Sequence, residues 1–294
     1  SDPIAFSVAS PVDVVVSLAL EAGELTTAHP LRAPGALICK GEATSVVAPV
    51  VTERRLDWPL LTAVEVASAR RPYIVVALGD SIADGSASVA ATTRNWPNAV
   101  SERAAAEDLR VIVLSAAIRG NRLLHAGVGP KAALHGLSGE ARLDRDALGQ
   151  PGADAVIVAL GINDLGLPNL PREQQVGAAD VIAGLDRTAQ RIRARGLTAV
   201  GATITPFEGI FQYDESKDVA RRDVNDWIRT APAFQHVLDF DAAVRDPERP
   251  TRLRRDCDSG DHLHLSARGV EALAAAVLDL RWPSSTEAPP ARLR

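Results

Sequence analysis

Short apolar runs alternate with longer segments of helical periodicity along most of this chain, and that alternation limits the possible fold more than any other feature. The apolar runs occupy residues 73–78, 111–115, 155–160, 199–204 and 237–240. Segments with helical spacing of apolar residues lie at 98–107, 139–148, 172–195, 215–230 and 267–280. Buried strands that alternate with helices are typical of a parallel sheet covered on both faces. The sequence therefore predicts a doubly wound α/β domain over residues 70–283, followed by a polar tail at 284–294.

Residues 1–69 have a different texture, because their valine-rich segments are short and lack helical spacing. These segments lie at 12–20, 44–52 and 61–68, separated by connections that contain Pro, Gly or Glu. The pattern favours antiparallel strands. A seven-stranded sandwich takes roughly 100 residues. We therefore expect residues 1–69 to form a small strand-rich domain, like an incomplete sandwich or jelly roll.

Composition excludes several classes of protein. The net charge of −5 gives no general attraction for nucleic acid, and no apolar run approaches the roughly 18 residues of a membrane span. The two cysteines, Cys39 and Cys257, fit neither a disulfide framework nor a zinc site of paired cysteines, and two buried free thiols are favoured over one bridge. The chain contains no methionine, so we expect that Ser1 is not the translation start.

Four polar segments lie where the predicted strands end or where the last helix begins. They occupy residues 79–83, 117–122, 161–164 and 258–264. In an open α/β sheet, ligands bind outside the carboxyl ends of the strands, so we expect these segments to converge. Taken singly, each also fits an ordinary turn, a helix cap or a surface ion pair.

Taken together, the segments contain the parts of a serine acyl-transfer site. A serine hydroxyl needs a base to remove its proton, and an imidazole base needs a carboxylate to hold its ring. We predict Ser81 as nucleophile and His264 as base, with Asp261 three residues away at the Nδ1 atom of His264. The predicted oxyanion donors are the backbone N–H groups of Ser81 and Gly120 and the side-chain amide of Asn163.

In this order, the four segments resemble the four blocks of the SGNH (GDSL-type) hydrolase superfamily. Ser81 matches the nucleophile of the Gly-Asp-Ser block, and Gly120 matches the glycine of the second block. Asn163 matches the Gly-x-Asn-Asp block, and Asp261 with His264 matches the Asp-x-x-His block. Residues 95–97, 120–124, 142–146 and 205–209 further resemble bacterial secreted-type GDSL esterases. The resemblance covers residues 70–280.

The resemblance implies a flavodoxin-like three-layer α/β/α fold and ester hydrolysis without a metal or other cofactor, often on acetylated or short acyl substrates. It also implies an N-terminal β-domain and export to the periplasm or the cell exterior, although nothing in the residues rules out the cytoplasm. The chain departs from the pattern at Ser115 and Ala117, where the second block often has asparagine and glycine, and at Leu265, where proline often follows the histidine. The first departure weakens the match of the residues around Gly120, but Gly120 itself still matches. The second departure should alter the wall of the site more than its chemistry.

Five apolar side chains near these blocks are candidates for the wall of a substrate site, although each also fits ordinary packing. They are Ile82, Trp96, Leu165, Phe207 and Phe211. Because only 4% of the chain is aromatic and no long apolar lid is visible, we expect short acyl chains to be preferred over long ones. The expected partner is a small ester, including an acetylated carbohydrate, and the oligomeric state is not predicted.

Two alternatives share part of the pattern. An α/β-hydrolase also orders serine, acid and histidine, but its Gly-x-Ser-x-Gly elbow needs glycine where this chain has Ala83. A catalytically inactive SGNH-like module that binds carbohydrate or lipid is the other alternative, and turnover of an acetate ester distinguishes it from an enzyme. Every catalytic position carries a competent residue, so a serine esterase is the prediction we favour.

Overall fold

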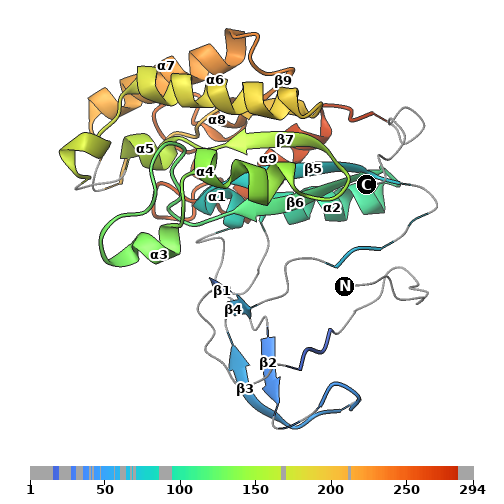
Figure 1. Cartoon of the computed structure of the whole chain (residues 1–294). Helices are drawn as coiled ribbons and strands as arrows, with labels where there is room; N and C mark the ends of the chain where they lie inside the picture. Colours follow the sequence, from blue (N-terminus) through green and yellow to red (C-terminus); the bar gives the residue numbers. More distant parts are fainter. Residues whose placement is uncertain are drawn as a thin grey trace. The chain divides into compact units, whose positions relative to one another are not determined.

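The structure is a computed structural model of the whole chain, which divides into two compact units, Ser1–Val66 and Ala67–Arg294. In the larger unit it describes residues 71–85, 95–166, 170–210 and 213–283, together with residue 68 (Figure 1). In the smaller unit it describes residues 16–19, 28–30, 36–39, 41, 43–46, 48–55, 57–59 and 64–66.

A five-stranded parallel sheet forms the centre of the larger unit, as far as the structure describes it. Its strands are β5 (Tyr73–Gly79), β6 (Val111–Ala117), β7 (Ala153–Ala159), β8 (Thr198–Ala202) and β9 (His236–Leu238). They lie in the order β6-β5-β7-β8-β9, and every neighbouring pair is parallel. This is the strand order of flavodoxin-like sheets, in which ligands bind where the winding reverses, here between β5 and β7.

Helices cover both faces of the sheet, because successive residues of a strand point to opposite sides. On β5, Val75 and Ala77 belong to one core layer, with α2 (Trp96–Ala106), α8 (Phe240–Val244) and α9 (Ala267–Leu278). Val76 and Leu78 belong to the other layer. That layer includes side chains of α4 (Gly139–Leu143), α5 (Ile162–Gly166), α6 (Ala178–Ala194) and α7 (Glu215–Thr230). Figure 1 shows α6 and α7 on one side of the sheet and α2 on the other. The predicted three-layer α/β/α fold is confirmed.

The remaining elements are short and lie in the connections. They are α1 (Ser81–Asp84), α3 (Ala132–His135), and the turns η1 (Gly129–Lys131), η2 (Asp144–Leu148) and η3 (Arg172–Gln174). The helix predicted at 172–195 is in fact η3 followed by α6. An extended Gly177 separates the two, and its N–H donates to the Asp180 carboxylate at 2.9 Å, which starts α6 after the glycine.

In the described part of the smaller unit, four short strands form two antiparallel pairs. β1 (Ala28–Pro30) pairs with β4 (Asp57–Pro59), and β2 (Ala36–Cys39) pairs with β3 (Val51–Arg55). Antiparallel strands were the right prediction, but among the described residues most of the predicted positions are wrong, because residues 16–19, 44–46, 48–50 and 64–66 are not in strands. The valines there are exposed, Val64 at 56% and Val66 at 69%, so strand propensity finds no apolar face to cover. Cys39 and Cys257 are both free thiols, of which Cys257 is buried and Cys39 only partly so.

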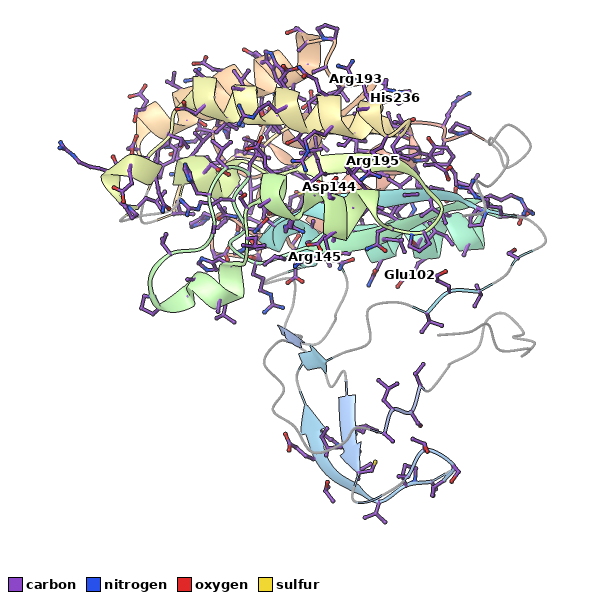
Figure 2. The ribbon with its side chains drawn as sticks, in the orientation of Figure 1. Glu102, Asp144, Arg145, Arg193, Arg195 and His236 are labelled. Carbon is purple, nitrogen blue, oxygen red and sulfur yellow. The ribbon has the colours of Figure 1, made fainter. Side chains whose placement is uncertain are left out.

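Charged side chains occupy the outer helix surfaces of the larger unit (Figure 2). Asp144 accepts hydrogen bonds from Arg191 at 2.6 Å and from Arg195 at 3.5 Å, which links η2 to α6. Exposed pairs of this kind each stabilise a fold by less than about 1 kcal/mol. None of the helices in the described part of the chain is both long enough and apolar enough to cross a membrane.

Candidate active site

Ser81 is the first residue of α1, two residues after β5 ends at Gly79. Asp80 stands between them and caps the helix, because its carboxylate accepts the N–H of Ile82 at 3.0 Å. Gly85, with φ +83°, ends the helix after one turn. The Ser81 side chain is therefore fixed at the carboxyl edge of the sheet, beside the point where the winding reverses.

The structure brings the three predicted residues of the triad into one hydrogen-bonded chain. Nε2 of His264 lies 2.9 Å from Oγ of Ser81, and Nδ1 of His264 lies 2.6 Å from Oδ2 of Asp261. The other oxygen of Asp261 accepts the backbone N–H groups of Leu263 at 3.0 Å and His264 at 2.8 Å. One carboxylate thus fixes both the loop and the imidazole ring.

The pKa of Asp261 follows from these contacts. Partial burial raises it, but the backbone N–H and the imidazole of His264, together with the Leu263 N–H, outweigh burial and lower the pKa to about 2. The carboxylate therefore stays ionised near neutral pH. It favours the tautomer with the proton on Nδ1, which leaves Nε2 free to accept the Ser81 proton.

The two other predicted oxyanion donors come from the segments that follow β6 and β7. Gly120 follows β6 with φ +68°, a conformation that favours glycine, and a Cβ there would lie 2.5 Å from Cδ2 of His135. Asn163 is the second residue of α5, and its side-chain nitrogen donates to the carbonyl of Asn121 at 3.0 Å. An amide has two hydrogens, so this bond fixes the side chain and leaves the second hydrogen for another acceptor.

A buried arginine joins the loops that carry these groups. Arg142 in α4 donates to the carbonyls of Gly79 at 3.0 Å and Ala116 at 2.6 Å, which lie at the ends of β5 and β6. It also donates to Oδ1 of Asn121 at 2.9 Å. One rigid guanidinium therefore sets the spacing of the Ser81 loop and the Gly120 loop.

Two buried carboxyl groups lie behind the site. Asp164 accepts the backbone N–H groups of Leu123 at 2.7 Å and Leu124 at 3.0 Å, which ties the loop after β6 to the loop after β7. Burial raises the pKa of Asp164 to about 6. Burial, with the nearby Asp164 carboxylate as a lesser cause, raises the pKa of Asp80 to about 7.

The raised pKa of Asp80 makes stability depend on pH. The folded protein keeps this proton up to about pH 7, whereas the unfolded chain releases it near 3.8, so folding becomes less favourable as pH rises between these values. Asp80→Asn keeps a good N-cap and removes the ionisation. We expect wild type to lose about 2–4 kcal/mol relative to this variant between about pH 4 and pH 8. Urea unfolding at a series of pH values measures the difference, and parallel curves for the two proteins would contradict it.

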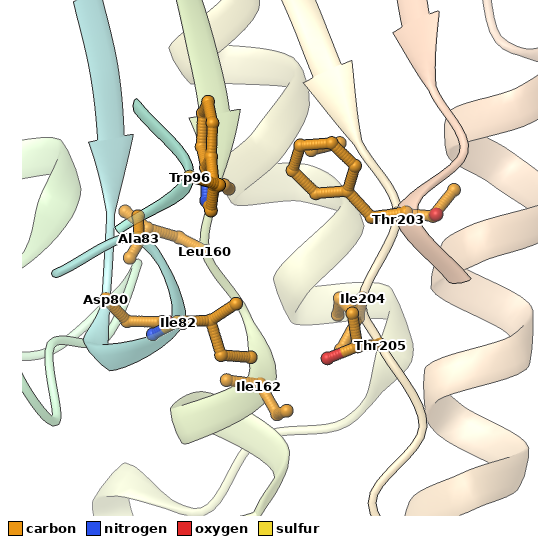
Figure 3. A pocket seen from close by; sticks show the side chains of 12 residues that line it. Asp80, Ile82, Ala83, Trp96, Leu160, Ile162, Thr203, Ile204 and Thr205 are labelled. Atoms are coloured by element: carbon orange, nitrogen blue, oxygen red, sulfur yellow. The ribbon is translucent and has the colours of Figure 1, made fainter. Parts of the chain in front are cut away.

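A small pocket opens next to α1, at the carboxyl ends of β5, β7 and β8 (Figure 3). Of the five predicted wall residues, Ile82 and Trp96 line it. Leu165 and Phe207 do not, because they are buried in the core layer that contains α6 and α7. Phe211 lies outside the described residues.

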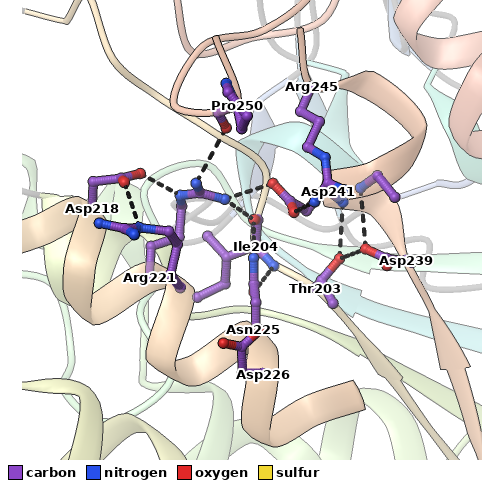
Figure 4. A network of polar contacts seen from close by, with 12 residues as sticks. Thr203, Ile204, Asp218, Arg221, Asn225, Asp226, Asp239, Asp241, Arg245 and Pro250 are labelled. Atoms are coloured by element: carbon purple, nitrogen blue, oxygen red, sulfur yellow. Dashed lines mark hydrogen bonds and ion pairs between the residues drawn. The ribbon is translucent and has the colours of Figure 1, made fainter. Parts of the chain in front are cut away.

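A buried polar network holds the far wall of this pocket (Figure 4). Just beyond the end of β8, the side chain of Asn225 accepts the N–H of Ile204 at 2.7 Å and donates to its carbonyl at 2.8 Å. Arg221 donates to the same carbonyl at 3.3 Å and to Asp241 at 2.6 Å. Beyond the end of β8, these side chains make the backbone hydrogen bonds that a neighbouring strand would otherwise make. They therefore fix the backbone position of Ile204 and of the residue after it.

Sequence reasoning missed the supporting residues of the site. In the sequence, Arg142 belongs only to a segment that resembles GDSL esterases. Nothing in its spacing indicates that its side chain binds two strand-end carbonyls and the side chain of Asn121. The arginines beside Gly120 both have partners within the fold. Arg119 pairs with Asp84 at 2.5 Å, and buried Arg122 donates to Gln174 at 2.7 Å. Within the described residues, no three His, Cys, Asp or Glu side chains are grouped to hold a metal ion.

Comparison with known proteins places the chain in a family. The model of the GDSL-like lipase/acylhydrolase family matches residues 77–272. A lipase/acylhydrolase from Enterococcus faecalis is 19% identical with a TM-score of 0.54, covering 75% of this chain and 100% of that chain. A variant of an acetyl-xylooligosaccharide esterase from Geobacillus Stearmophilus is 23% identical with a TM-score of 0.52, covering 76% and 98%. No curated protein matches the chain.

The structural likenesses, at such low identity, support the fold alone. The family match is broader, because it extends over more than half of the chain and includes all four segments predicted to form the site. The predicted resemblance and the predicted class, a GDSL-type esterase or acylhydrolase, are confirmed at this level. The chain belongs to the GDSL-like lipase/acylhydrolase family.

Proposed function

We propose that the protein is a serine esterase that hydrolyses short-chain, acetyl-type carboxylic esters through a Ser81–His264–Asp261 triad. The observation that carries the proposal is the unbroken chain of contacts from Asp261 through His264 to Ser81, at 2.6 and 2.9 Å. An imidazole held in this way is a competent base for a serine hydroxyl.

In the first half of the proposed reaction, Ser81 Oγ attacks the carbonyl carbon of the ester while Nε2 of His264 takes its proton. The carbonyl oxygen becomes an oxyanion, which the N–H groups of Ser81 and Gly120 and the amide of Asn163 stabilise. Each such donor contributes about two to three orders of magnitude in rate. His264 then gives its proton to the leaving alcohol, and Ser81 carries the acyl group.

In the second half, water attacks the acyl-enzyme while His264 accepts one of its protons. The second tetrahedral intermediate collapses, the bond to Ser81 Oγ breaks, and His264 returns the proton to that oxygen. The carboxylic acid leaves and the site is restored. Asp261 remains ionised throughout and balances the imidazolium that forms twice in each cycle.

The size of the pocket beside α1 supports the proposal that the acyl group of the substrate is short. The cavity volume is about 20 Å³, and a cavity needs about 10–15 Å³ to hold a single water. Ile82, Trp96 and Ile162 surround this space with apolar surface. An acetyl methyl group fits, whereas a longer chain forces side chains out of their packing at a cost of about 1–3 kcal/mol.

Acyl-chain length tests the proposal directly. We expect kcat/KM for a series of ethyl esters to be greatest at acetate and to fall at least about tenfold by hexanoate. Release of acid, followed by titration at constant pH, gives the rates. A steady rise from acetate to long-chain esters contradicts the proposed substrate class, and no turnover on any acyl chain favours the binding module instead.

The role proposed for Arg142 predicts a second result. Arg142→Lys removes the fork that reaches two strand ends and Asn121 at once, so the Ser81 and Gly120 loops shift relative to each other. A shift of about 1 Å is enough to lower kcat about 10- to 100-fold, with a smaller change in KM. Arg187→Lys is the matched control, because Arg187 is an exposed α6 residue that pairs with Glu140 at 2.9 Å. A folded Arg142→Lys variant with wild-type kcat would refute the positioning role.

A further inference from the structure

Asp164 joins the two segments that carry the Gly120 and Asn163 oxyanion donors. Its Oδ2 atom accepts the N–H of Leu123 at 2.7 Å, and its Oδ1 atom accepts the N–H of Leu124 at 3.0 Å. Both N–H groups belong to the segment that follows β6, whereas Asp164 is the residue after Asn163 in α5. An ionised carboxylate accepts on both oxygens, whereas a protonated carboxyl group turns one of them into a donor.

A second contact runs in the other direction between the same two segments. The side-chain nitrogen of Asn163 donates to the carbonyl of Asn121, the residue after Gly120, at 3.0 Å. The first turn of α5 therefore holds the segment after β6 at two places, at Asn121 through a donor and at Leu123 through an acceptor. These two ties set the spacing between the Gly120 N–H and the Asn163 amide.

The contacts of Asp164 lie where bulk water does not replace them. Asp164 is 2% exposed and Leu123 is 0% exposed. A buried N–H that loses its acceptor carries the full cost of its desolvation, so the backbone moves to pair it elsewhere. Loss of one carboxylate oxygen as acceptor therefore displaces the segment that carries Gly120.

Charged groups from three neighbouring segments determine the ionisation of Asp164. Arg122, from the segment after β6, favours the ionised form. Asp80, from the loop after β5, repels the Asp164 carboxylate, and Arg142 of α4 attracts Asp80. Burial outweighs Arg122 and the two N–H groups, so the pKa of Asp164 is about 6. The side chain is then about nine-tenths ionised at about pH 7 and about one-tenth ionised at about pH 5.

We propose that Asp164 is a positioning residue whose ionised carboxylate holds the Gly120 N–H and the Asn163 amide at the spacing that the oxyanion needs. The inference rests on the proposed function, because it concerns the oxyanion that attack by Ser81 would form. Protonation of Asp164 places a new donor against a backbone N–H, and the segment after β6 moves away from it. A shift of about 1 Å lowers the rate about 10- to 100-fold.

Asp164→Asn tests the positioning role, because its amide nitrogen likewise faces one of the two N–H groups. With ethyl acetate at about pH 8, we expect kcat to fall about 10- to 100-fold while KM stays within about threefold. Asp154→Asn is the matched control. The Asp154 side chain is 8% exposed and accepts the N–H of Ile74 at 2.8 Å, near the opposite end of β7 from the site. Its kcat should stay within about threefold of wild type. A folded Asp164→Asn variant with wild-type kcat would overturn the positioning role.

The pH dependence of kcat separates this role from a merely structural one. Protonation of His264 lowers the rates of wild type and Asp164→Asn alike, so it cancels in the ratio of the two kcat values. We expect this ratio to fall about fivefold or more between about pH 8 and about pH 5, because only wild type has a carboxylate to lose. A ratio that stays constant over this range would contradict the inference.

Amide resonances of isotope-labelled protein give a readout that does not require turnover. In wild type, the N–H signals of Leu123, Leu124 and Gly120 should shift together with a midpoint near the Asp164 pKa of about 6. This common shift should vanish in Asp164→Asn. A Gly120 signal that does not follow the other two, or that keeps its midpoint in the variant, would overturn the inference. If no ester is cleaved, the proposed function fails, and the resonances still decide whether Asp164 controls the Gly120 N–H.

Discussion

Ser81→Ala lowers kcat/KM for ethyl acetate by about 10⁴- to 10⁶-fold, and the activity that remains comes from the oxyanion donors and substrate binding. The substitution removes the oxygen that attacks the carbonyl and leaves His264 without the proton that it accepts at 2.9 Å. Residues that act as one catalytic unit lose nearly all of their effect when the nucleophile is lost. Steady-state kinetics with active-site titration of wild type gives the ratio.

A serine elsewhere in the larger unit serves as the control for this variant. Ser101 in α2 accepts the N–H of Val113 at 2.9 Å, so Ser101→Ala makes the same chemical change at another partly buried hydroxyl. We expect its kcat/KM to stay within about threefold of wild type, because surface and peripheral changes leave the site in place. A Ser81→Ala variant that retains a tenth of wild-type activity, after contamination is excluded, would rule out Ser81 as nucleophile.

Asp261→Asn lowers kcat by about 10³- to 10⁴-fold while the protein stays folded. The amide oxygen still accepts the N–H groups of Leu263 and His264, which bond to Oδ1 in the wild type. The new NH₂ group replaces Oδ2, the acceptor 2.6 Å from Nδ1 of His264. It therefore favours the tautomer with a proton on Nε2, which no longer accepts the Ser81 proton.

A neighbouring pair of the same chemistry provides a matched control. Asp258 lies 2.6 Å from Nδ1 of His262, and its other oxygen accepts backbone N–H groups, as in Asp261. Asp258→Asn should leave kcat within about threefold of wild type, because His262 is not the base in the proposed reaction. Equal losses in the two variants would mean that the loop as a whole, and not the imidazole tautomer, sets the rate.

The fold and the principal site residues could be predicted because they depend on local patterns. Apolar runs between helices determine a parallel sheet, and the polar segments at the carboxyl ends of its strands must then meet at one edge. The three-residue spacing of Asp261 and His264 is also local, and the 2.6 Å contact between them is the geometry that such a spacing permits.

The supporting residues could not be predicted, because their roles depend on contacts between distant segments. Arg142 lies 63 residues from Gly79 along the chain, and no periodicity reports the hydrogen bond between them. Phe207 and Leu165 were predicted near a substrate because they adjoin polar blocks in the chain, but the structure buries both side chains in the core layer that contains α6 and α7.

The positions of the N-terminal strands could not be predicted for a different reason. Valine-rich segments favour strands wherever a face is available for packing, so propensity alone does not locate them. In the described residues the strands instead include Ala28–Pro30 and Asp57–Pro59, which contain no valine.

Labelling with a serine-reactive phosphonate is the most direct test of the central claim. The wild-type enzyme is treated with an alkyl phosphonate ester, and the modified residue is located by peptide mass spectrometry while ethyl acetate hydrolysis is followed in the same sample. We expect one label per chain, on Ser81, with activity lost in proportion to labelling and with Ser81→Ala unlabelled. A fully inactivated enzyme with Ser81 unmodified, or an active enzyme with Ser81 fully modified, would contradict the account.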